Sequence, residues 1–290
     1  MKGFSGGTVE VRVRKTAADK SKNTRLDYEI TRLNHIGQNY GPHICTPTIY
    51  QDSRLIKDGV FSYEMEYIPG LRLEDALPTM TVSEIGKTAQ RLACFIMACS
   101  DNLAIPSPRG IVITPEEQFI REKLDSISLH IDPEWPESIE YTDVAKWVEV
   151  DTPTKSTMCH GDLALDNIIV SGNRLYLIDA LCQGFDNYHW DIAKILQSCL
   201  CHWPTVRDND EIYPMDESFP ILGSLLLRAL DEHCDHARVV LYLGTTLARI
   251  IPYAPTERQK RMLLSMSTFV LKGYLSNSFI TQPVPLSEPC

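Results

Sequence analysis

Apolar and polar positions alternate with a period of two near the N-terminus of this 290-residue chain. Residues 8–14 read Thr-Val-Glu-Val-Arg-Val-Arg, the pattern of a half-buried strand. Residues 49–56 and 60–68 are two further strand-like runs, and the Asp58-Gly59 pair between them is a hairpin signal. The second of these runs places four side chains on one face: Phe61, Tyr63, Met65 and Tyr67. Residues 25–36 carry apolar side chains at helical spacing, so the first third is predicted to be a small sheet with one helix.

After Pro69-Gly70 the apolar positions recur mostly at helical spacing. Thr81 and Glu84 have the spacing of a capping box, and Thr256 with Gln259 makes a second plausible cap. Helices are predicted over residues 85–96, after Thr114, and over 191–200, 221–230, 239–250 and 258–275. Residues 135–153 lack such a stripe and are expected to be irregular and exposed. Two short apolar strands, 168–170 and 175–178, flank a tight Ser-Gly-Asn hairpin.

This pattern predicts an α+β protein with two lobes. The N-lobe, residues 1–69, would hold an antiparallel sheet and one helix, and the C-lobe, residues 70–290, would be mainly helical. The boundary is placed at Pro69-Gly70 because that pair ends the last strand of the sheet.

Composition excludes several classes of function. A net charge of −10 disfavours a nucleic-acid partner, because phosphate backbones need a basic face. No apolar run reaches the length of a membrane span, and residues 1–7 lack an apolar leader, so a cytoplasmic protein without a membrane partner is expected. The nine cysteines show no framework spacing and are expected to be reduced thiols. The oligomeric state is left open.

The residues that carry chemistry gather in one stretch of the sequence. His160, Asp162, Asn167 and Asp179 stand in the order that phosphoryl transfer from a metal nucleotide requires. Taken singly, each is more simply explained as a turn, capping or packed residue. Together they lie on a predicted loop, strand, turn and strand after a hinge, and this context favours kinase chemistry.

This stretch resembles the aminoglycoside phosphotransferase and choline kinase superfamily, the small-molecule branch of the protein-kinase-like fold. The resemblance is strongest over residues 158–198, where His-Gly-Asp-Leu is followed by an Asn five residues after the Asp, and weaker over residues 3–70. It implies a bilobal kinase-like fold, with ATP or another nucleoside triphosphate and magnesium as cofactors.

The resemblance also implies roles for individual residues. Asp162 would be the catalytic base, and His160, grouped with it as a catalytic residue, would brace the loop. Asn167 and Asp179 would bind magnesium through their oxygens. Asp191 matches the family's downstream Asp, which helps to hold the catalytic loop.

The N-terminal residues supply candidates for nucleotide binding. Gly6 and Gly7 stand where this fold has its phosphate-covering loop, although the glycine spacing departs from the family's pattern. Lys15 is the candidate for the lysine that neutralises the α- and β-phosphates, because strand parity places it with the valines on the inner face. Arg12 and Arg14, on the other face, are its rivals.

The same resemblance implies two further features of nucleotide binding. Glu29, on the predicted helix, would pair with Lys15, and Asp27 is the alternative. The hinge would be Met65-Glu66-Tyr67-Ile68, so Glu66 and Ile68 are candidates for contacts to the adenine.

Departures from the protein-kinase pattern point to a small acceptor. Asp179 is followed by Ala180-Leu181 instead of Phe-Gly, and Asp191 comes only twelve residues later, without Ala-Pro-Glu. That interval is too short for the platform on which protein kinases bind peptides. The predicted function is therefore transfer of the γ-phosphate to a hydroxyl of a small molecule such as a sugar, an aminoglycoside or an amino alcohol.

The acceptor itself is not settled by the sequence. Acidic residues at 208, 210, 211, 216 and 217 suggest a cationic acceptor, with an aromatic wall from Trp190, Trp203 and Tyr213, but a neutral sugar is at least as compatible. Two other classes of function stay open, a nucleotide-binding pseudokinase that serves as a scaffold and a protein kinase. The intact Asp162, Asn167 and Asp179 speak against the first, and the short segment after Asp179 against the second.

Overall fold

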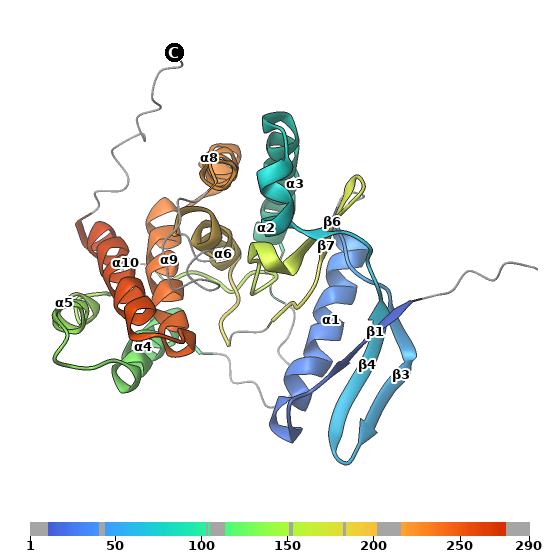
Figure 1. Ribbon diagram of the computed structural model, residues 1–290, viewed down its shortest axis with the longest axis horizontal. Helices are drawn as coiled ribbons and strands as arrows, with labels where there is room; N and C mark the ends of the chain where they lie inside the picture. The colour runs from blue at the N-terminus through green and yellow to red at the C-terminus, as the bar shows by residue number, and fades with distance from the viewer. Residues whose placement is uncertain are drawn as a thin grey trace, which may run out of the picture.

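The computed structural model of the chain describes residues 11–40, 44–102, 104, 114–150, 153–181, 184–201 and 216–276. These residues form two small sheets and a larger body of helices, with α1 lying between the first sheet and the other helices (Figure 1). The α+β class predicted from the sequence is confirmed.

The first sheet is antiparallel and has the order β1-β4-β3, with bounds β1 (Arg12–Thr16), β3 (Ile49–Lys57) and β4 (Val60–Glu66). The predicted hairpin joins β3 to β4, and both Asp58 (φ 54°) and Gly59 (φ 81°) have the positive φ that a type I′ turn requires. Phe61, Tyr63 and Met65, predicted to share a face, are all buried. Tyr67, grouped with them, is 50% exposed and lies beyond the end of β4 at Glu66.

Helix α1 (Asn23–Asn39) follows a short 3₁₀ turn, η1 (Lys20–Lys22), and packs against β4. Ile30, Leu33 and Ile36 form its buried stripe, at the spacing that the sequence predicts. The helix extends beyond the predicted residues 25–36 at both ends. It thus presents one face to the sheet and another to the helical part of the molecule (Figure 1).

The second sheet joins strands that are far apart in the sequence. Its order is β2-β7-β6-β5, with bounds β2 (Ile44–Cys45), β5 (Leu71–Arg72), β6 (Ile168–Ser171) and β7 (Arg174–Leu177). The predicted hairpin between β6 and β7 is confirmed. A Cβ on Gly70 would lie 2.3 Å from the main-chain oxygen of Val170, so glycine is needed where the chain passes β6. The lobe boundary at this point stays a prediction.

The remaining elements are helices and 3₁₀ turns. Their bounds are α2 (Leu73–Ala76), η2 (Leu77–Thr79), α3 (Val82–Ser100), α4 (Glu116–Asp125), η3 (Ser126–His130), α5 (Pro136–Ala145), η4 (Leu165–Asn167), α6 (Tyr188–Leu200), α8 (Ser218–Leu230), η5 (Asp231–His233), α9 (His236–Ile250), η6 (Ile251–Tyr253) and α10 (Glu257–Ser276). Both predicted caps are present: the Glu84 amide donates to Thr81 Oγ1 (3.3 Å) and the Gln259 amide to Thr256 Oγ1 (3.2 Å).

Helix α5 corrects the expectation that residues 135–153 are irregular. It begins at Pro136, which suits a first helical position because proline lacks the amide hydrogen that would be unpaired there. Ser138, Tyr141, Val144 and Ala145 form its buried side, and the helix packs against α10. Because the buried side includes a serine and a small alanine, the apolar stripe is weak and the pattern gives no clear signal.

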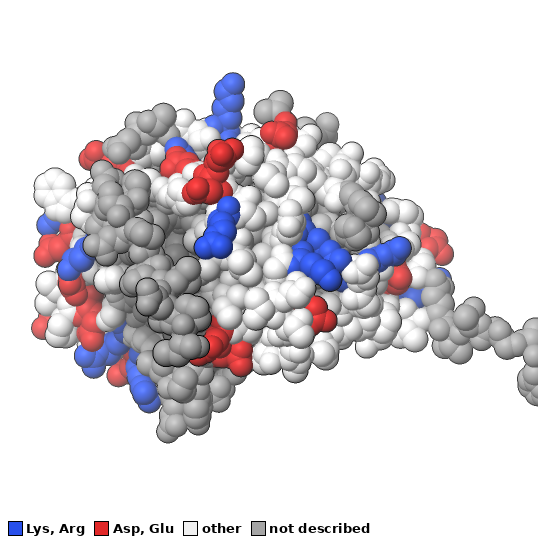
Figure 2. Space-filling model, turned by 90° about the horizontal axis from the view of Figure 1, so that it is seen from above, with Lys and Arg blue, Asp and Glu red and all other residues white. Residues whose placement is uncertain are grey.

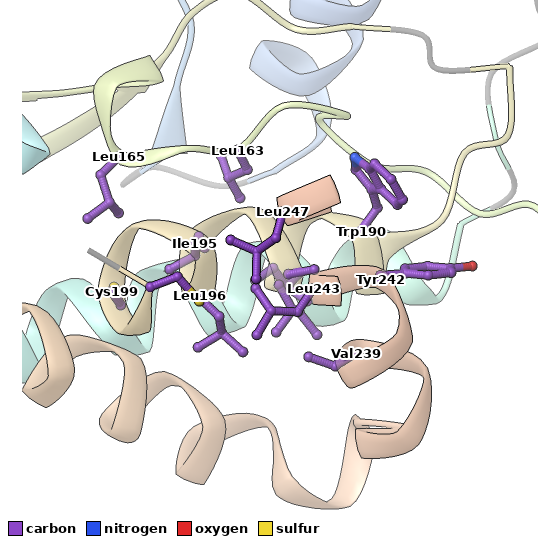
Figure 3. Close-up of a cluster of buried hydrophobic side chains, with 14 of the residues drawn as sticks. Leu163, Leu165, Trp190, Ile195, Leu196, Cys199, Val239, Tyr242, Leu243 and Leu247 are labelled. Carbon is purple, nitrogen blue, oxygen red and sulfur yellow. The ribbon is translucent and has the colours of Figure 1, made fainter. Parts of the chain in front are cut away.

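The core of the helical part lies between α6 and α9. Trp190, Ile195 and Leu196 of α6 pack with Tyr242 and Leu247 of α9 in one buried cluster (Figure 3). The same cluster contains two fully buried leucines from the stretch before β6, Leu163 and Leu165. The predicted catalytic loop is therefore anchored in the core directly after Asp162.

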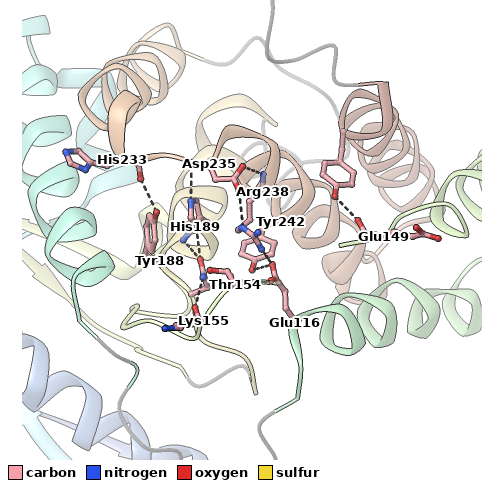
Figure 4. A network of polar contacts seen from close by, with 12 residues as sticks. Glu116, Glu149, Thr154, Lys155, Tyr188, His189, His233, Asp235, Arg238 and Tyr242 are labelled. Carbon is pink, nitrogen blue, oxygen red and sulfur yellow. Dashed lines mark hydrogen bonds and ion pairs between the residues drawn. The ribbon is translucent and has the colours of Figure 1, made fainter. Parts of the chain in front are cut away.

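A buried polar network fixes α4 and α9 to the segment before the catalytic loop (Figure 4). The Glu116 carboxylate accepts hydrogen bonds from the Tyr242 hydroxyl (2.7 Å) and the Thr154 amide (2.8 Å), and it forms an ion pair with Arg238. The Asp235 amide donates to Nε2 of His189 at 3.1 Å. These bonds satisfy polar groups whose burial would otherwise be costly.

The surface seen in Figure 2 carries acidic and basic side chains interspersed, with uncharged areas between them. None of the described helices is long and apolar enough to cross a membrane.

Candidate active site

The main chain of the predicted catalytic loop is held by a side chain of α6. The carboxylate of Asp191, on α6, accepts the amide hydrogens of His160 (2.5 Å) and Gly161 (2.8 Å). Gly161 has φ 85°, and a Cβ there would lie 2.0 Å from the main-chain oxygen of Leu181. Burial raises the pKa of Asp191 to about 7, while the two amide donors favour its charged form. Asp191 thus lies where the resemblance places it, beside the loop.

His160 is fully buried beneath this loop. Burial lowers the pKa of its imidazole to about 4, so the ring is neutral at pH 7. Its Nδ1 accepts the amide hydrogen of Asp162 at 3.4 Å, so the ring contacts the loop's own backbone. This placement suits a brace and not a group that transfers protons at neutral pH.

Asp162 lies between two cations from different helices. Lys194 Nζ of α6 is 2.9 Å from Asp162 Oδ1, and Arg249 Nη2 of α9 is 3.8 Å from the same oxygen. Burial alone would raise the pKa of this carboxyl, but the charges of Lys194 and Arg249 lower it below its ordinary value. Asp162 is therefore ionised at neutral pH.

Lys194 and Arg249 were not identified from the sequence. Lys194 follows Asp191 by three residues and so lies one helical turn along the same face, a signal that the spacing offered. Arg249 lies near the end of the apolar stripe of α9, and nothing in the pattern connects it with a loop almost ninety residues earlier.

Asn167 directly precedes the β6–β7 hairpin, and Asp179 follows it shortly after the end of β7. The Ile178 amide donates to the main-chain oxygen of Asn167 at 3.1 Å, and Asn167 Nδ2 donates to the main-chain oxygen of Asp162 at 2.9 Å. Asp179 follows β7 with φ 61°, a left-handed conformation that is uncommon outside glycine and often marks functional sites. Its side chain is 42% exposed, so the carboxylate is open to a ligand.

Lys15 connects the first sheet to this site. Its Nζ lies 2.5 Å from Oε1 of Glu29 and 2.5 Å from Oδ1 of Asp179. Burial would lower the pKa of this ammonium, yet the two carboxylates raise it, so Lys15 is charged. The Tyr63 hydroxyl also donates to Glu29 Oε1, at 3.0 Å.

The rivals of Lys15 and Glu29 lie elsewhere. Arg12 and Arg14 both form ion pairs with Glu64. Asp27 forms an ion pair with Arg54. Of the alternatives left open by the sequence, the structure brings Lys15 and Glu29 to Asp179.

Arg32 is a buried residue that the sequence did not single out. It lies on α1, one turn after Glu29, and forms a buried ion pair with Asp186. Its Nη1 also donates to the main-chain oxygens of Cys159 (3.1 Å) and Leu181 (2.6 Å). Helix α1 is thereby joined to the segments on both sides of the predicted catalytic residues.

A single cleft of about 1120 Å³ brings the site together. Lys15, Glu29, Asp162, Asn167 and Asp179 all line it. Glu66 and Ile68 do not line this cleft in the part of the chain that the structure describes; Glu66 accepts hydrogen bonds from Thr48, and Ile68 is buried.

The remaining sequence-based candidates are only partly described. Gly6, Gly7, residues 208–211, Trp203 and Tyr213 lie outside the described residues. Trp190 is 1% exposed and packs between Phe119 and Tyr242, so the expectation that it forms part of an acceptor wall is wrong.

The sequence matches the family described as "Phosphotransferase enzyme family" over residues 15–213, more than half of the chain. No curated protein matches the chain in sequence.

Several solved structures share the fold. The GDP complex of wild-type aminoglycoside 2'-phosphotransferase-IIIa is 17% identical, with 92% of this chain and 87% of that chain covered and a TM-score of 0.61. A thermostable mutant of aminoglycoside phosphotransferase APH(4)-Ia in its apo form is 11% identical, with coverages of 96% and 93% and a TM-score of 0.59. A ternary complex of an APH(4)-Ia mutant with AMP-PNP and hygromycin B is 13% identical, with coverages of 92% and 87% and a TM-score of 0.60.

Proposed function

The chain belongs to the phosphotransferase enzyme family and is a small-molecule phosphotransferase, and from this premise we propose that it moves the γ-phosphoryl group of ATP, or of another nucleoside triphosphate, to a hydroxyl of its acceptor. The observation that carries the proposal is the convergence of Lys15, Asp162 and Asp179 in one cleft. Lys15 and Asp179 are 164 positions apart in the sequence, and packing alone does not require their charges to meet.

The residues of the cleft fit magnesium. The side-chain amide nitrogen of Asn167 donates a hydrogen bond to the main-chain oxygen of Asp162. The side-chain amide oxygen of Asn167 is therefore available as a metal ligand. Asp179 adds an exposed carboxylate, and both are hard oxygen donors. No group of three or more His, Cys, Asp or Glu side chains suited to a metal occurs among the described residues. Magnesium bound with a nucleotide commonly takes one or two protein carboxylates together with phosphate oxygens. When bound, magnesium would neutralise charge on the phosphates.

Lys15 would contact the phosphates of the nucleotide. Its ammonium is held between Glu29 and Asp179 and kept charged by both. A cation fixed in this way stabilises phosphate charge without having to be reoriented during the reaction. Gly6, Gly7, Glu66 and Ile68 are proposed as further nucleotide contacts on the resemblance alone.

Asp162 would orient the acceptor hydroxyl and take its proton as the oxygen attacks the γ-phosphorus. The new O–P bond forms while the bond to the β-phosphate oxygen breaks, and the nucleoside diphosphate leaves. His160 and Asp191 act on this step only through the shape of the loop. Because Asp162 is held in the cleft by Lys194 and Arg249, positioning would supply much of the catalysis.

Two of the solved structures that share the fold are complexes with kanamycin and with hygromycin B. Both ligands are hydroxylated small molecules, which supports an acceptor of that general size. Nothing in the described residues favours a pseudokinase or a protein kinase over this proposal.

The test is the Asp162→Asn variant, assayed for ADP release with magnesium-ATP against a set of hydroxylated acceptors. Loss of a general base should lower the rate by about 10²–10⁴. Nucleotide affinity, measured by titration calorimetry, should change little because Asp162 is not proposed to bind the phosphates. Near-normal rates in the variant would remove Asp162 from this role, and magnesium-ATP binding without turnover of any acceptor would favour a pseudokinase.

A further inference from the structure

Basic side chains gather around Asp162 in the cleft. Arg25 enters from the first turn of α1, Lys123 from α4 and Arg249 from α9. We call these three residues the basic wall. Within the described residues, six lysine and arginine side chains line the cleft against four aspartate and glutamate side chains. This excess contrasts with the net charge of −10 for the whole chain.

Three of the four acidic side chains of the cleft form ion pairs with Lys15 or Lys194, which lie outside the basic wall. Glu29 and Asp179 pair with Lys15, and Asp162 pairs with Lys194 at 2.9 Å and more distantly, at 3.8 Å, with Arg249 of the wall. Neither Arg25 nor Lys123 forms an ion pair with a carboxylate in the part of the chain that the structure describes. Two members of the basic wall, Arg25 and Lys123, therefore bring positive charge into the cleft that these carboxylates do not pair with.

The cations of the wall are close enough to affect one another. Burial lowers the pKa of Arg249, the charge of Asp162 raises it, and the charge of Arg25 lowers it. Burial also lowers the pKa of Lys123, and there the charge of Arg249 adds to the effect. Like charges from three elements repel one another, and a bound anion would relieve that repulsion.

We propose that the acceptor carries an anionic group, a carboxylate or a phosphate, besides the hydroxyl that is phosphorylated, and that the basic wall binds this group. The inference rests on the proposed function and specifies its acceptor. Arg249 lies 3.8 Å from Asp162, so an anion held by the wall would leave a hydroxyl of the same small molecule beside Asp162. A polycationic aminoglycoside would instead meet like charges there.

A matched set of acceptors tests the charge preference. Glucose, gluconate, glucose 6-phosphate and glucosamine share a hydroxylated scaffold and differ in charge. We expect kcat/KM for at least one of the two anions to exceed that for glucose by tenfold or more, with glucosamine poorest. Comparing gluconate with glucose 6-phosphate identifies which anion is recognised. A preference for glucosamine or an aminoglycoside would overturn the inference while leaving the proposed function standing.

Variants locate the preference in the structure. Lys123→Gln and Arg25→Gln should each lower the ratio of kcat/KM for the anionic acceptor to that for glucose by at least tenfold. Lys87→Gln, which removes an exposed lysine on α3 that does not line the cleft, should leave the ratio unchanged. If the variants instead raised KM for magnesium-ATP equally with every acceptor, the wall would bind the triphosphate and the inference would be wrong.

A binding experiment keeps the inference testable if none of these sugars is turned over. Protein loaded with magnesium and AMP-PNP should bind inorganic phosphate or tartrate saturably at millimolar concentration, and Lys123→Gln should weaken that binding at least tenfold. Absence of saturable binding, or equal binding by the variant, would overturn the inference. Failure of the proposed function is distinct from this, because it would show as lack of turnover with every acceptor whatever its charge.

Discussion

A carboxylate 2.9 Å from a lysine ammonium, as Asp162 is from Lys194, keeps its negative charge more firmly than one in water. Such a group is a weak proton acceptor, so it is better suited to orient a hydroxyl than to remove its proton early. This agrees with a loose transition state for phosphoryl transfer, in which the nucleophile needs little activation. Lys194 therefore sets how basic Asp162 is.

Replacing Lys194 by methionine should move the acidic limb of the pH profile. Without the ammonium, burial would dominate and raise the pKa of Asp162, so kcat/KM should begin to fall at a higher pH than in the parent protein. Lys194→Arg, which keeps the charge, should retain most of the original profile. The measurement is kcat/KM between about pH 4 and pH 8, and an unchanged acidic limb in Lys194→Met would contradict this account.

Gly161 is the residue at which the loop tolerates no side chain. Its positive φ and a Cβ position 2.0 Å from the oxygen of Leu181 predict that Gly161→Ala lowers the free energy of unfolding by more than about 1 kcal/mol. Gly86→Ala is the matched control, because Gly86 lies inside α3 and a Cβ added there would meet nothing within 4 Å. That change should stabilise by about 0.5–1 kcal/mol. Urea denaturation checks both, and equal effects would contradict the steric argument.

Helix α1 matters at the scale of the element because it holds two functional contacts. Glu29 pairs with Lys15, and Arg32, one turn later, pairs with Asp186 and donates to the oxygen of Leu181. The helix thus aligns Lys15, the proposed phosphate-binding lysine, with the segment that carries Asp179.

Arg32→Met should be strongly destabilising because it leaves Asp186 buried without its main cationic partner. The loss of one member of a buried ion pair costs about 3–5 kcal/mol. The double variant Arg32→Met/Asp186→Leu removes the stranded charge and should recover part of that loss. Chemical denaturation of the parent, single and double variants measures this, and a double variant no more stable than Arg32→Met would argue against the ion pair as the cause.

Elements with a local signal were predictable from the sequence. The Asp58-Gly59 hairpin and the Thr81 and Thr256 caps form within a few residues, so the sequence contains all that determines them. Helix α5 lacked such a signal because much of its buried side is not strongly apolar and its partner, α10, is more than a hundred residues away.

The residues of the candidate site also divide into those that the sequence indicated and those that it did not. The stretch from His160 to Asp179 was recognisable because its residue types and spacing lie close together in sequence. Lys194 and Arg249 were missed because they reach Asp162 only through the packing of α6 and α9, and Arg32 because its partner is 154 positions away. The basic wall could not be predicted at all, since its three residues come from three separate helices.

At the scale of the whole molecule, the cleft is bordered by the first sheet with α1 and by the helices beyond it, so a nucleotide bound there should stabilise both. At about one hundred times its dissociation constant, magnesium-AMP-PNP should raise the free energy of unfolding by about 2.7 kcal/mol. Asp179→Ala should lose the part of this gain that depends on magnesium. Thermal unfolding with and without magnesium measures the difference, and an equal gain in the variant would mean that Asp179 does not hold the metal.

The anchoring of α1 also bears on how such an enzyme is controlled. To swing away from the cleft, α1 would have to leave Asp186 without its guanidinium, and a cost of about 3–5 kcal/mol would restrict that conformer to fewer than about one molecule in a hundred. An effector that acts by binding the conformer with α1 swung away would therefore find very little of that conformer to bind. We therefore expect a constitutive catalyst whose output follows the supply of its two substrates and not an on–off switch.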